Sequence, residues 1–220
     1  MQVTVVVPTF NEGPNVEELV GRLAVAVEGI DAEVLFVDDS TDDTPAVVDR
    51  VAEASALPVR LLRRDEPVGG LSGAVVEGLG QARGEWVVVM DGDLQHPPEM
   101  VPVLLETAAS TGADLVVASR YTGNGDAGGL DGRWRHLVSS ASSLLARSMF
   151  PVRLRNVTDP MTGFFAVRTA AIDVAALRFG VPHVNFLNFA FVWLAIHQLG
   201  YAWRDGAFPT PARALLWSAA

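Results

Sequence analysis

Apolar residues in this chain follow two patterns: short, nearly unbroken runs and longer segments with helical spacing. The short runs, rich in valine and leucine, are residues 3–7, 33–37, 58–64, 86–90 and 114–119. Such runs are typical of strands buried on both faces of a sheet. Between them, apolar residues recur at i, i+3, i+4 and i+7, and Pro14 and Pro45 fit the first turns of two such helices. The alternation predicts an α/β fold with a doubly wound, mostly parallel sheet and a Rossmann-like nucleotide-binding half.

Polar and acidic residues follow directly after three of the predicted strands. The first strand leads into Pro8, Thr9, Phe10, Asn11 and Glu12, the second into Asp38 and Asp39, and the fourth into Asp91, Gly92 and Asp93. Ligands bind outside the carboxyl ends of the strands in an open parallel sheet. We therefore expect the three strand ends to form one site, with a nucleotide across the first two and a cation at the third.

Asp91 and Asp93 have a spacing that suits a divalent cation. Two carboxylates at i and i+2, with Gly92 leaving room between them, can hold a cation that keeps other positions for water and substrate phosphates. The alternative is a turn aspartate followed by one that caps the helix expected near Pro97 and Pro98. The acids at residues 38–43 have a similar alternative as turn and cap residues.

Composition narrows the chemistry. The chain has no cysteine, which excludes disulfides, thiolate zinc sites and a cysteine nucleophile. Lysine is also absent, so all 16 basic residues are arginine and only arginine can anchor phosphate as a permanent cation. The net charge of −10 argues against nucleic acid as a partner. The first residues enter a strand without a basic stretch, so we expect no signal peptide and a cytoplasmic protein.

Basic residues gather downstream of the predicted cation site. A glycine-rich stretch begins at Arg120, and Arg133 and Arg135 lie close to the start of the next predicted helix. A loop of this length in a compact domain is typically an active-site loop or a disordered segment. Its arginines would relieve the repulsion between substrate phosphates. The alternative for Arg133 and Arg135 is a solvated helix start.

The chain changes character towards its end. A short strand is predicted to end at Arg168, and residues 179–203 contain no charged side chain. That stretch is long enough to span a membrane, but its proline, asparagine and glutamine residues favour a surface-lying or core helix. Its aromatic residues suit a membrane interface. We therefore divide the chain into a main domain, residues 1–178, which carries the candidate site, and an apolar C-terminal segment, residues 179–220.

Four motifs together resemble a known family. They are Val-Val-Val-Pro8-Thr-Phe-Asn11-Glu12, Phe-Val-Asp38-Asp39-Ser40-x-Asp42-x-Thr44, Met-Asp91-Gly-Asp93-Leu-Gln95-His-Pro-Pro98 and Ala-Ser119-Arg120-Tyr121. In this order and spacing they resemble the family 2 glycosyltransferases with the GT-A fold, and among these the dolichyl- and polyprenyl-phosphate mannose synthases. The likeness runs from residue 3 to about residue 178 and fails beyond it, where the expected Ser-Lys ending is missing.

The resemblance implies roles for matching positions. The implied nucleotide-sugar pocket comprises Pro8, Phe10, Glu12, Val37, Asp39 and Asp91. The implied Mg²⁺ or Mn²⁺ site comprises Asp91, Asp93 and Gln95, with Asp93 as principal ligand. The implied phosphate and acceptor site comprises Arg120, Arg133, Arg135, Ser139 and Arg213. Asp91, Asp93 and Arg120 are the implied catalytic residues.

The expected activity is inverting, metal-dependent transfer of a hexose, mannose from GDP-mannose, to a polyprenyl or dolichyl phosphate at the cytoplasmic membrane face. A phosphate acceptor is already an anionic nucleophile, so no general base is required. One alternative is transfer of glucose or another sugar from a UDP-sugar. Another is a non-catalytic nucleotide-sugar-binding protein, because the tail departs from the family. A membrane-protein partner is compatible with each of these activities.

Overall fold

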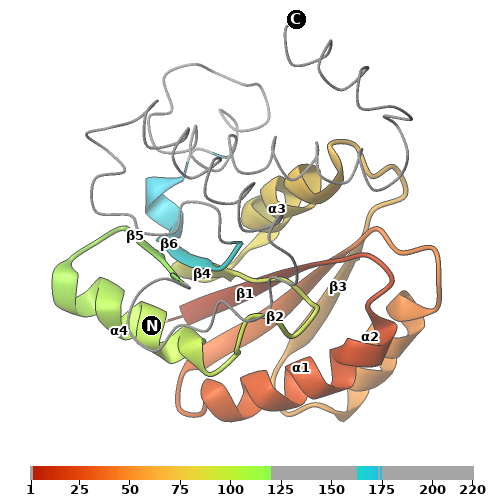
Figure 1. The fold of residues 1–220 in the computed structure, drawn as a ribbon, viewed down its shortest axis with the longest axis horizontal. Helices are drawn as coiled ribbons and strands as arrows, with labels where there is room; N and C mark the ends of the chain where they lie inside the picture. The colour runs from red at the N-terminus through yellow and green to blue at the C-terminus, as the bar shows by residue number, and fades with distance from the viewer. Residues whose placement is uncertain (1, 120–162, 173, 175–220) are drawn as a thin grey trace, which may run out of the picture.

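The computed structural model describes residues 2–119, 163–172 and 174 of the 220-residue chain. These residues form a six-stranded sheet in the order β3-β2-β1-β4-β6-β5 (Figure 1). The strands are β1 (Gln2–Thr9), β2 (Asp31–Asp38), β3 (Val59–Arg63), β4 (Trp86–Val89), β5 (Leu115–Val117) and β6 (Phe165–Arg168). The helices are α1 (Gly13–Ala26), α2 (Thr44–Ala54), α3 (Gly70–Gln81) and α4 (Met100–Thr111), and a short 3₁₀ turn spans Thr169–Ala171.

The predicted α/β fold is confirmed. Strands β3, β2, β1 and β4 are parallel neighbours, and a helix follows each of them in the chain. Pro14 and Pro45 lie in the first turns of α1 and α2, where a missing backbone N–H has no consequence.

The direction of β6 was not predicted. β6 runs antiparallel to both β4 and β5 and lies between them, so the sheet is mixed rather than wholly parallel. β5 is consequently parallel to β4 without touching it. The strand predicted to end at Arg168 is present, but its direction depends on the connection from β5, which no periodicity in a four-residue run reveals.

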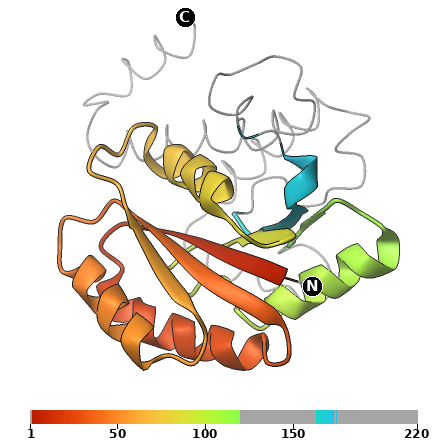
Figure 2. The same cartoon turned by 180° about the vertical axis from the view of Figure 1, so that it is seen from behind.

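Two hydrophobic clusters cover the two faces of the sheet, as a doubly wound fold requires. Figures 1 and 2 show α1, α2 and α4 against one face and α3 against the other. Successive strand residues point to opposite faces: Val5 and Phe36 pack with α1, α2 and α4, whereas Val6 and Leu35 pack with α3. All four side chains are at most 1% exposed.

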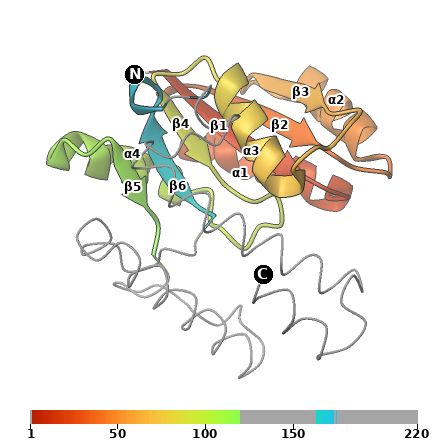
Figure 3. The same cartoon turned by 90° about the horizontal axis from the view of Figure 1, so that it is seen from above.

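The register places three strand ends side by side. Thr9 at the end of β1 pairs with Asp38 at the end of β2, and Val6 of β1 pairs with Val89 of β4. Met90 extends the second ladder by donating its N–H to the oxygen of Val6. Figure 3 shows β4, β1 and β2 in this order across the sheet. The loops after these strands therefore meet at one edge, as predicted.

No helix within the described ranges combines the length and apolar character needed to cross a bilayer. Residues 179–203, considered above as an interfacial segment, lie outside those ranges.

Candidate active site

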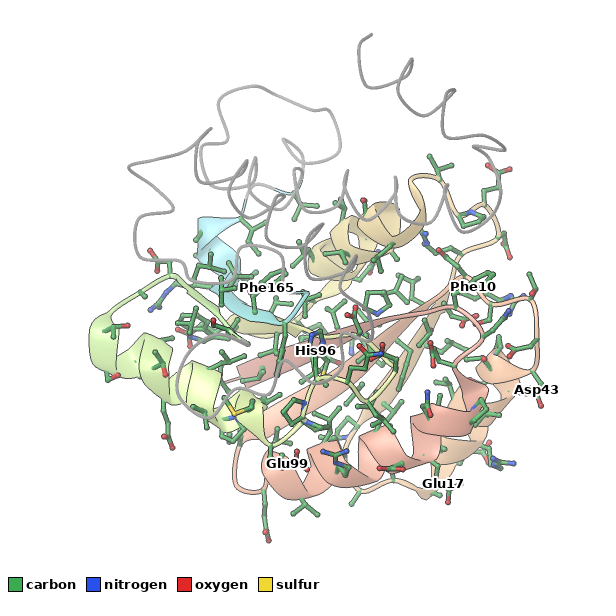
Figure 4. The ribbon with its side chains drawn as sticks, viewed as in Figure 1. Phe10, Glu17, Asp43, His96, Glu99 and Phe165 are labelled. Carbon is green, nitrogen blue, oxygen red and sulfur yellow. The ribbon has the colours of Figure 1, made fainter. Side chains whose placement is uncertain are left out.

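The loop after β1 is fastened to the loop after β2 by side-chain hydrogen bonds. Asn11 has a positive φ of 59°, a left-handed conformation that asparagine tolerates better than most residues. Its N–H donates to Ser40 Oγ at 2.8 Å, and its Oδ1 accepts from the Thr41 N–H at 3.0 Å. This turn leaves the Phe10 side chain 52% exposed beside the strand ends (Figure 4).

Asp38 is a structural acid. Its side chain is fully buried, and its Oδ1 accepts hydrogen bonds from the hydroxyls of Thr9 and Ser40. Its Oδ2 lies 3.5 Å from Arg63 Nη1 and accepts from the Ser40 N–H at 3.3 Å. These contacts satisfy both carboxylate oxygens within the protein, so Asp38 ties the ends of β1 and β2 together.

Asp39 points the other way and meets a buried arginine. The Arg64 guanidinium donates to both of its oxygens, from Nε to Oδ1 at 2.7 Å and from Nη2 to Oδ2. The two side chains are 8% and 11% exposed. Asp39 is also held through its backbone, since its N–H donates to Thr9 O at 3.0 Å. The residue expected in a nucleotide pocket is therefore fixed at the junction of β1 and β2.

The turn alternative holds for Asp42. Its Oδ1 accepts from the N–H and the hydroxyl of Thr44 at 3.0 and 2.6 Å, and these bonds lower the pKa of the Asp42 carboxyl. Asp43 occupies the cap position of α2 but makes no capping hydrogen bond through its side chain. Thr44 Oγ1 in turn accepts from the Gly13 N–H at 2.9 Å, which joins the starts of α1 and α2.

The end of β4 lies close against the end of β1. A Cβ atom on Gly92 would lie 3.2 Å from Thr9 Cγ2, 3.4 Å from Val7 Cγ1 and 3.7 Å from Glu12 Cγ. The missing side chain of Gly92 therefore lets the loop that carries Asp91 and Asp93 approach the first strand closely. The three predicted strand ends do come together.

Asp93 is a turn residue and not a helix cap. Its Oδ1 accepts the Gln95 N–H at 3.0 Å, and Leu94 between them has a positive φ of 61°. Helix α4 begins only at Met100, with Glu99 in the cap position and no capping hydrogen bond from its side chain. The capping alternative is therefore wrong, although the turn alternative describes one of the two Asp93 oxygens.

His96 folds back over this turn. Its Nδ1 lies 3.5 Å from the Asp91 backbone nitrogen and 3.5 Å from Asp91 Oδ2, and its ring packs at 5.2 Å from the ring of Phe164. Phe164 is 1% exposed and immediately precedes β6. His96 thus connects the acidic turn to the segment that enters the last strand (Figure 4).

The acids of the site repel one another. Burial raises the pKa of Glu12, the negative charges of Asp93, Asp91 and Asp42 raise it further, and a hydrogen bond from Asn15 at 2.7 Å opposes the shift. Among the described residues, no ion pair brings an arginine to Asp93 or Glu12. The part of the site that the structure describes therefore has an excess of negative charge, which a bound cation would neutralise.

The metal ligands predicted from sequence are partly placed. Asp91 and Asp93 share the turn after β4, and the neighbouring Gln95 is exposed. Within residues 2–119, 163–172 and 174, no group of three or more His, Asp or Glu side chains is arranged to hold a metal. Two carboxylates in one turn fit a cation such as Mg²⁺, which usually takes its other ligands from water and substrate phosphates.

The remaining predicted residues divide into two groups. Pro8 and Val37 are buried, and the Val37 side chain packs into the α3-side cluster, so it can offer a ligand only its backbone. Arg120, Arg133, Arg135, Ser139 and Arg213 lie outside the described residues. The sequence provided no reason to assign a structural role to Asn11 or Arg64. Asn11 lies in the first motif, which could have indicated its role, but nothing in the local sequence marks Arg64.

The sequence matches the family model described as glycosyl transferase family 2 over residues 4–175. This chain belongs to glycosyl transferase family 2. It is 39% identical to a dolichol-phosphate mannosyltransferase of Pyrococcus furiosus over 81% of this chain and 49% of the relative. It is 36% identical to a protein of the same name from Mycosarcoma maydis, over 84% of this chain and 61% of the relative. The chain thus spans about half to under two thirds of these relatives.

The chain is also similar to an undecaprenyl-phosphate mannosyltransferase and to two proteins of known structure. An undecaprenyl-phosphate mannosyltransferase of Micrococcus luteus is 35% identical over 81% of this chain and 72% of its own. A mannosyl-3-phosphoglycerate synthase from Rubrobacter xylanophilus has a TM-score of 0.60 at 22% identity, covering 78% of this chain and 55% of that one. A glucosyl-3-phosphoglycerate synthase from Mycobacterium tuberculosis has a TM-score of 0.59 at 23% identity, covering 77% and 56%. These structures share the α/β glycosyltransferase fold of GT-A type with this chain.

Proposed function

We propose that this chain is the catalytic part of an inverting, metal-dependent hexosyltransferase, which transfers mannose from GDP-mannose to a polyprenyl or dolichyl phosphate at the cytoplasmic face of a membrane. The observation that carries the proposal is the meeting of Asp39, Asp91 and Asp93 at one sheet edge in a family 2 chain. The relatives' names, dolichol-phosphate and undecaprenyl-phosphate mannosyltransferase, support mannose as the sugar and a prenyl phosphate as the acceptor.

The ends of β1 and β2 provide the nucleoside half of the donor site. Phe10 is exposed and offers a ring face to a base, and Asp39 offers carboxylate oxygens to N–H or O–H groups. Aromatic stacking tolerates any base, so base selectivity falls to groups such as Asp39 that form hydrogen bonds. The bridge from Asn11 to Ser40 and Thr41 keeps the two loops in register.

The end of β4 provides the diphosphate half. Asp91 and Asp93 would hold Mg²⁺ or Mn²⁺, and a solved structure of the same fold contains Mn²⁺ together with uridine diphosphate. A cation held by these two acids would supply positive charge to the donor diphosphate and to the leaving nucleoside diphosphate. The Gln95 N–H fixes one Asp93 oxygen, which orients the other. His96, with its ring on Phe164, covers the turn from the side of β6.

The acceptor half follows from the chemistry of a phosphate monoester. Such an acceptor is anionic near neutral pH, so the site has to relieve phosphate repulsion rather than remove a proton. Arg120, Arg133, Arg135, Ser139 and Arg213 are proposed for this task. In-line attack on the anomeric carbon from the side opposite the leaving group inverts its configuration, which gives a β-linked lipid product from an α-linked donor.

Sugar transfer to a prenyl phosphate tests the proposal. Purified protein is incubated with prenyl phosphate, Mg²⁺ or Mn²⁺ and labelled GDP-mannose, UDP-glucose or other nucleotide sugars in parallel. We expect label in the lipid fraction with GDP-mannose, and loss of that label with EDTA or in Asp93→Ala. Asp49→Asn, which neutralises an exposed acid on α2, is the matched control and should retain activity.

Each outcome has a defined meaning. Lipid label with a UDP-sugar alone would replace the donor while retaining the reaction. Label that persists in EDTA or in Asp93→Ala would exclude the cation role. Donor binding without a lipid product from any sugar would exclude the transferase and leave a nucleotide-sugar-binding protein.

A further inference from the structure

Arg64 is the most completely engaged arginine among the described residues. It follows β3, its side chain is 8% exposed, and its guanidinium donates to four acceptors. Two acceptors are the Asp39 carboxylate oxygens, and the others are the backbone oxygens of Val68 and Gly70, at 3.2 and 2.8 Å. Its own N–H donates to Asp38 O at 3.0 Å. The guanidinium therefore lies between the Asp39 carboxylate on one side and the backbone oxygens of Val68 and Gly70 on the other.

The chain between β3 and α3 is shaped to make this enclosure. Gly69 and Gly70 have positive φ values of 78° and 52°, which glycine adopts without strain. A Cβ on Gly73 would lie 1.9 Å from Val68 O and 2.7 Å from Arg64 Nη1. Three glycines thus allow the backbone to turn carbonyl oxygens towards the arginine and allow α3 to start directly against them.

Two other arginines lack this arrangement. Arg63 is its neighbour in sequence, but its side chain is 50% exposed and its ion-pair contact with Asp38 is 3.5 Å long. Arg22 also forms a fork on a carboxylate, that of Glu99, yet both side chains are well exposed, at 34% and 55%. Arg64 alone of the three combines the two-oxygen fork with burial. Lysine, with one charged nitrogen, cannot reproduce this planar set of donors.

The arginine leaves Asp39 able to bind a ligand. Each carboxylate oxygen has two lone pairs, and Arg64 takes one hydrogen-bonding position on each oxygen. The Asp39 side chain is 11% exposed, and its backbone N–H donates a hydrogen bond to the oxygen of Thr9. Thr9 is followed by the exposed Phe10. The remaining acceptor positions of Asp39 therefore lie at the strand end next to Thr9, where the proposed function puts the nucleoside.

We infer that Arg64 is a positioning residue for nucleotide recognition: it holds the Asp39 carboxylate in one orientation for hydrogen bonding to the nucleoside, and it connects that orientation to the loop of residues 65–70. The inference rests on the proposed nucleotide-sugar site. Arg64 acts through Asp39 and does not itself contact the donor.

A double-mutant cycle tests this coupling. The full chain is prepared as wild type, Arg64→Lys, Asp39→Asn and the double variant, and the affinities for GDP and UDP are measured by calorimetry with Mn²⁺. We expect Arg64→Lys to weaken binding of the preferred nucleotide about tenfold, because a charged hydrogen-bonding acceptor loses its orientation. In the Asp39→Asn background the same change should alter affinity less than about twofold.

Kinetics and matched variants separate positioning from folding. Arg64→Lys should raise the donor KM with little change in kcat, because the reacting groups lie at the other end of the site. Arg22→Lys makes the same replacement at the exposed fork on Glu99 and should leave both constants unchanged. Gly73→Ala, which displaces Val68 O without altering charge, should reproduce the weaker binding, and it replaces Arg64→Lys in the cycle should that variant not fold.

The outcomes distinguish this inference from the proposed function. Wild-type protein that binds neither nucleotide would overturn both. Wild-type binding with unchanged affinity in Arg64→Lys would overturn only the role of Arg64. An equal loss in the presence and absence of the Asp39 carboxylate would also overturn it, because Arg64 would then act by a route other than Asp39.

Discussion

The two acids at the end of β2 and Asp93, after β4, have opposite surroundings among the described residues. Asp38 and Asp39 each have an arginine within 4.0 Å, and Asp38 also accepts two hydroxyl hydrogen bonds. Asp93, after β4, accepts one backbone N–H and has no arginine partner among the described residues. Within the described residues, one sheet edge thus carries two acids paired with arginine and one acid, Asp93, that is not.

The difference separates two tasks that acidic residues perform. An acid whose charge is balanced inside the protein can fix a backbone or present a hydrogen-bond acceptor at little electrostatic cost. An acid without such a partner, near other negative groups, attracts a cation from outside. The raised pKa of Glu12, caused first by burial and then by repulsion from Asp93 and Asp91, is consistent with the second situation.

The largest expected effect is on catalysis, from Asp93→Asn. The asparagine oxygen can still accept the Gln95 N–H, but one of the proposed cation ligands loses its charge. We expect transferase activity to fall at least about a hundredfold, roughly 3 kcal/mol in transition-state stabilisation, with an unchanged or slightly higher melting temperature. Activity assays and thermal unfolding on the same preparation measure both. A stable variant with wild-type activity would remove the distinction between the two strand ends.

The same substitution at Asp38 should affect folding instead. Asparagine would place an NH₂ group towards donors on Ser40 and Arg63, because both Asp38 oxygens act as acceptors. We expect Asp38→Asn to lower the free energy of unfolding by about 1–3 kcal/mol. Urea denaturation gives the value. A loss in Asp38→Asn no larger than that in Asp93→Asn would contradict the assignment of Asp38 to structure.

A smaller effect should appear in the pH dependence of stability. Because the folded state raises the pKa of Glu12, it holds the proton more tightly than the unfolded state does. Stability from this group is thus present below the unfolded pKa and lost as pH rises through the raised value. Glu12→Gln, which can still accept from Asn15, should therefore be more stable than wild type above that pH, by a few tenths of a kcal/mol after solvent screening.

Added Mn²⁺ is the control for the stability difference between wild type and Glu12→Gln. Mn²⁺ would relieve the repulsion that raises the pKa of Glu12, so the stability difference between wild type and Glu12→Gln should shrink when Mn²⁺ is added. Unfolding curves from pH 4 to pH 8 with and without Mn²⁺ measure this. If the difference in free energy of unfolding between the two proteins depends on neither pH nor metal, the charges of Asp91 and Asp93 do not affect Glu12.

The smallest effect is expected at the exposed fork. Arg22 lowers the pKa of Glu99 by hydrogen bonding, so stability from this pair is present above the ordinary carboxyl pKa and lost as pH falls through the lowered value. Solvent screens both groups, and Arg22→Lys should cost less than about 0.5 kcal/mol and respond to salt. A larger cost by denaturant unfolding would mean that the fork contributes even when it is exposed, so burial would not distinguish Arg64 from Arg22.

The sequence allowed the strand ends to be predicted because buried strands are continuous in sequence. The valine runs predicted β1, β2 and β4, and parallel geometry then placed Asp39 near Asp91. The direction of β6 was not predictable, because it depends on the path of the preceding connection and not on the residues of a four-residue strand. The Arg64 contacts were not predictable either. Its partners include the backbone oxygens of Val68 and Gly70, and every residue has a backbone oxygen, so residue type does not indicate such a contact.

The position of β6 gives the fold an order of assembly. β4 has only four residues, and its ladder on one side is supplied by residues 165–168. A chain emerging from the ribosome therefore completes β1, β2 and β3 well before it can enclose β4 from both sides, and β5 has no partner but β6 among the described strands. The ends of β1 and β2 can therefore pair early in synthesis, whereas β4 gains its second neighbour only after residues 165–168 have been made.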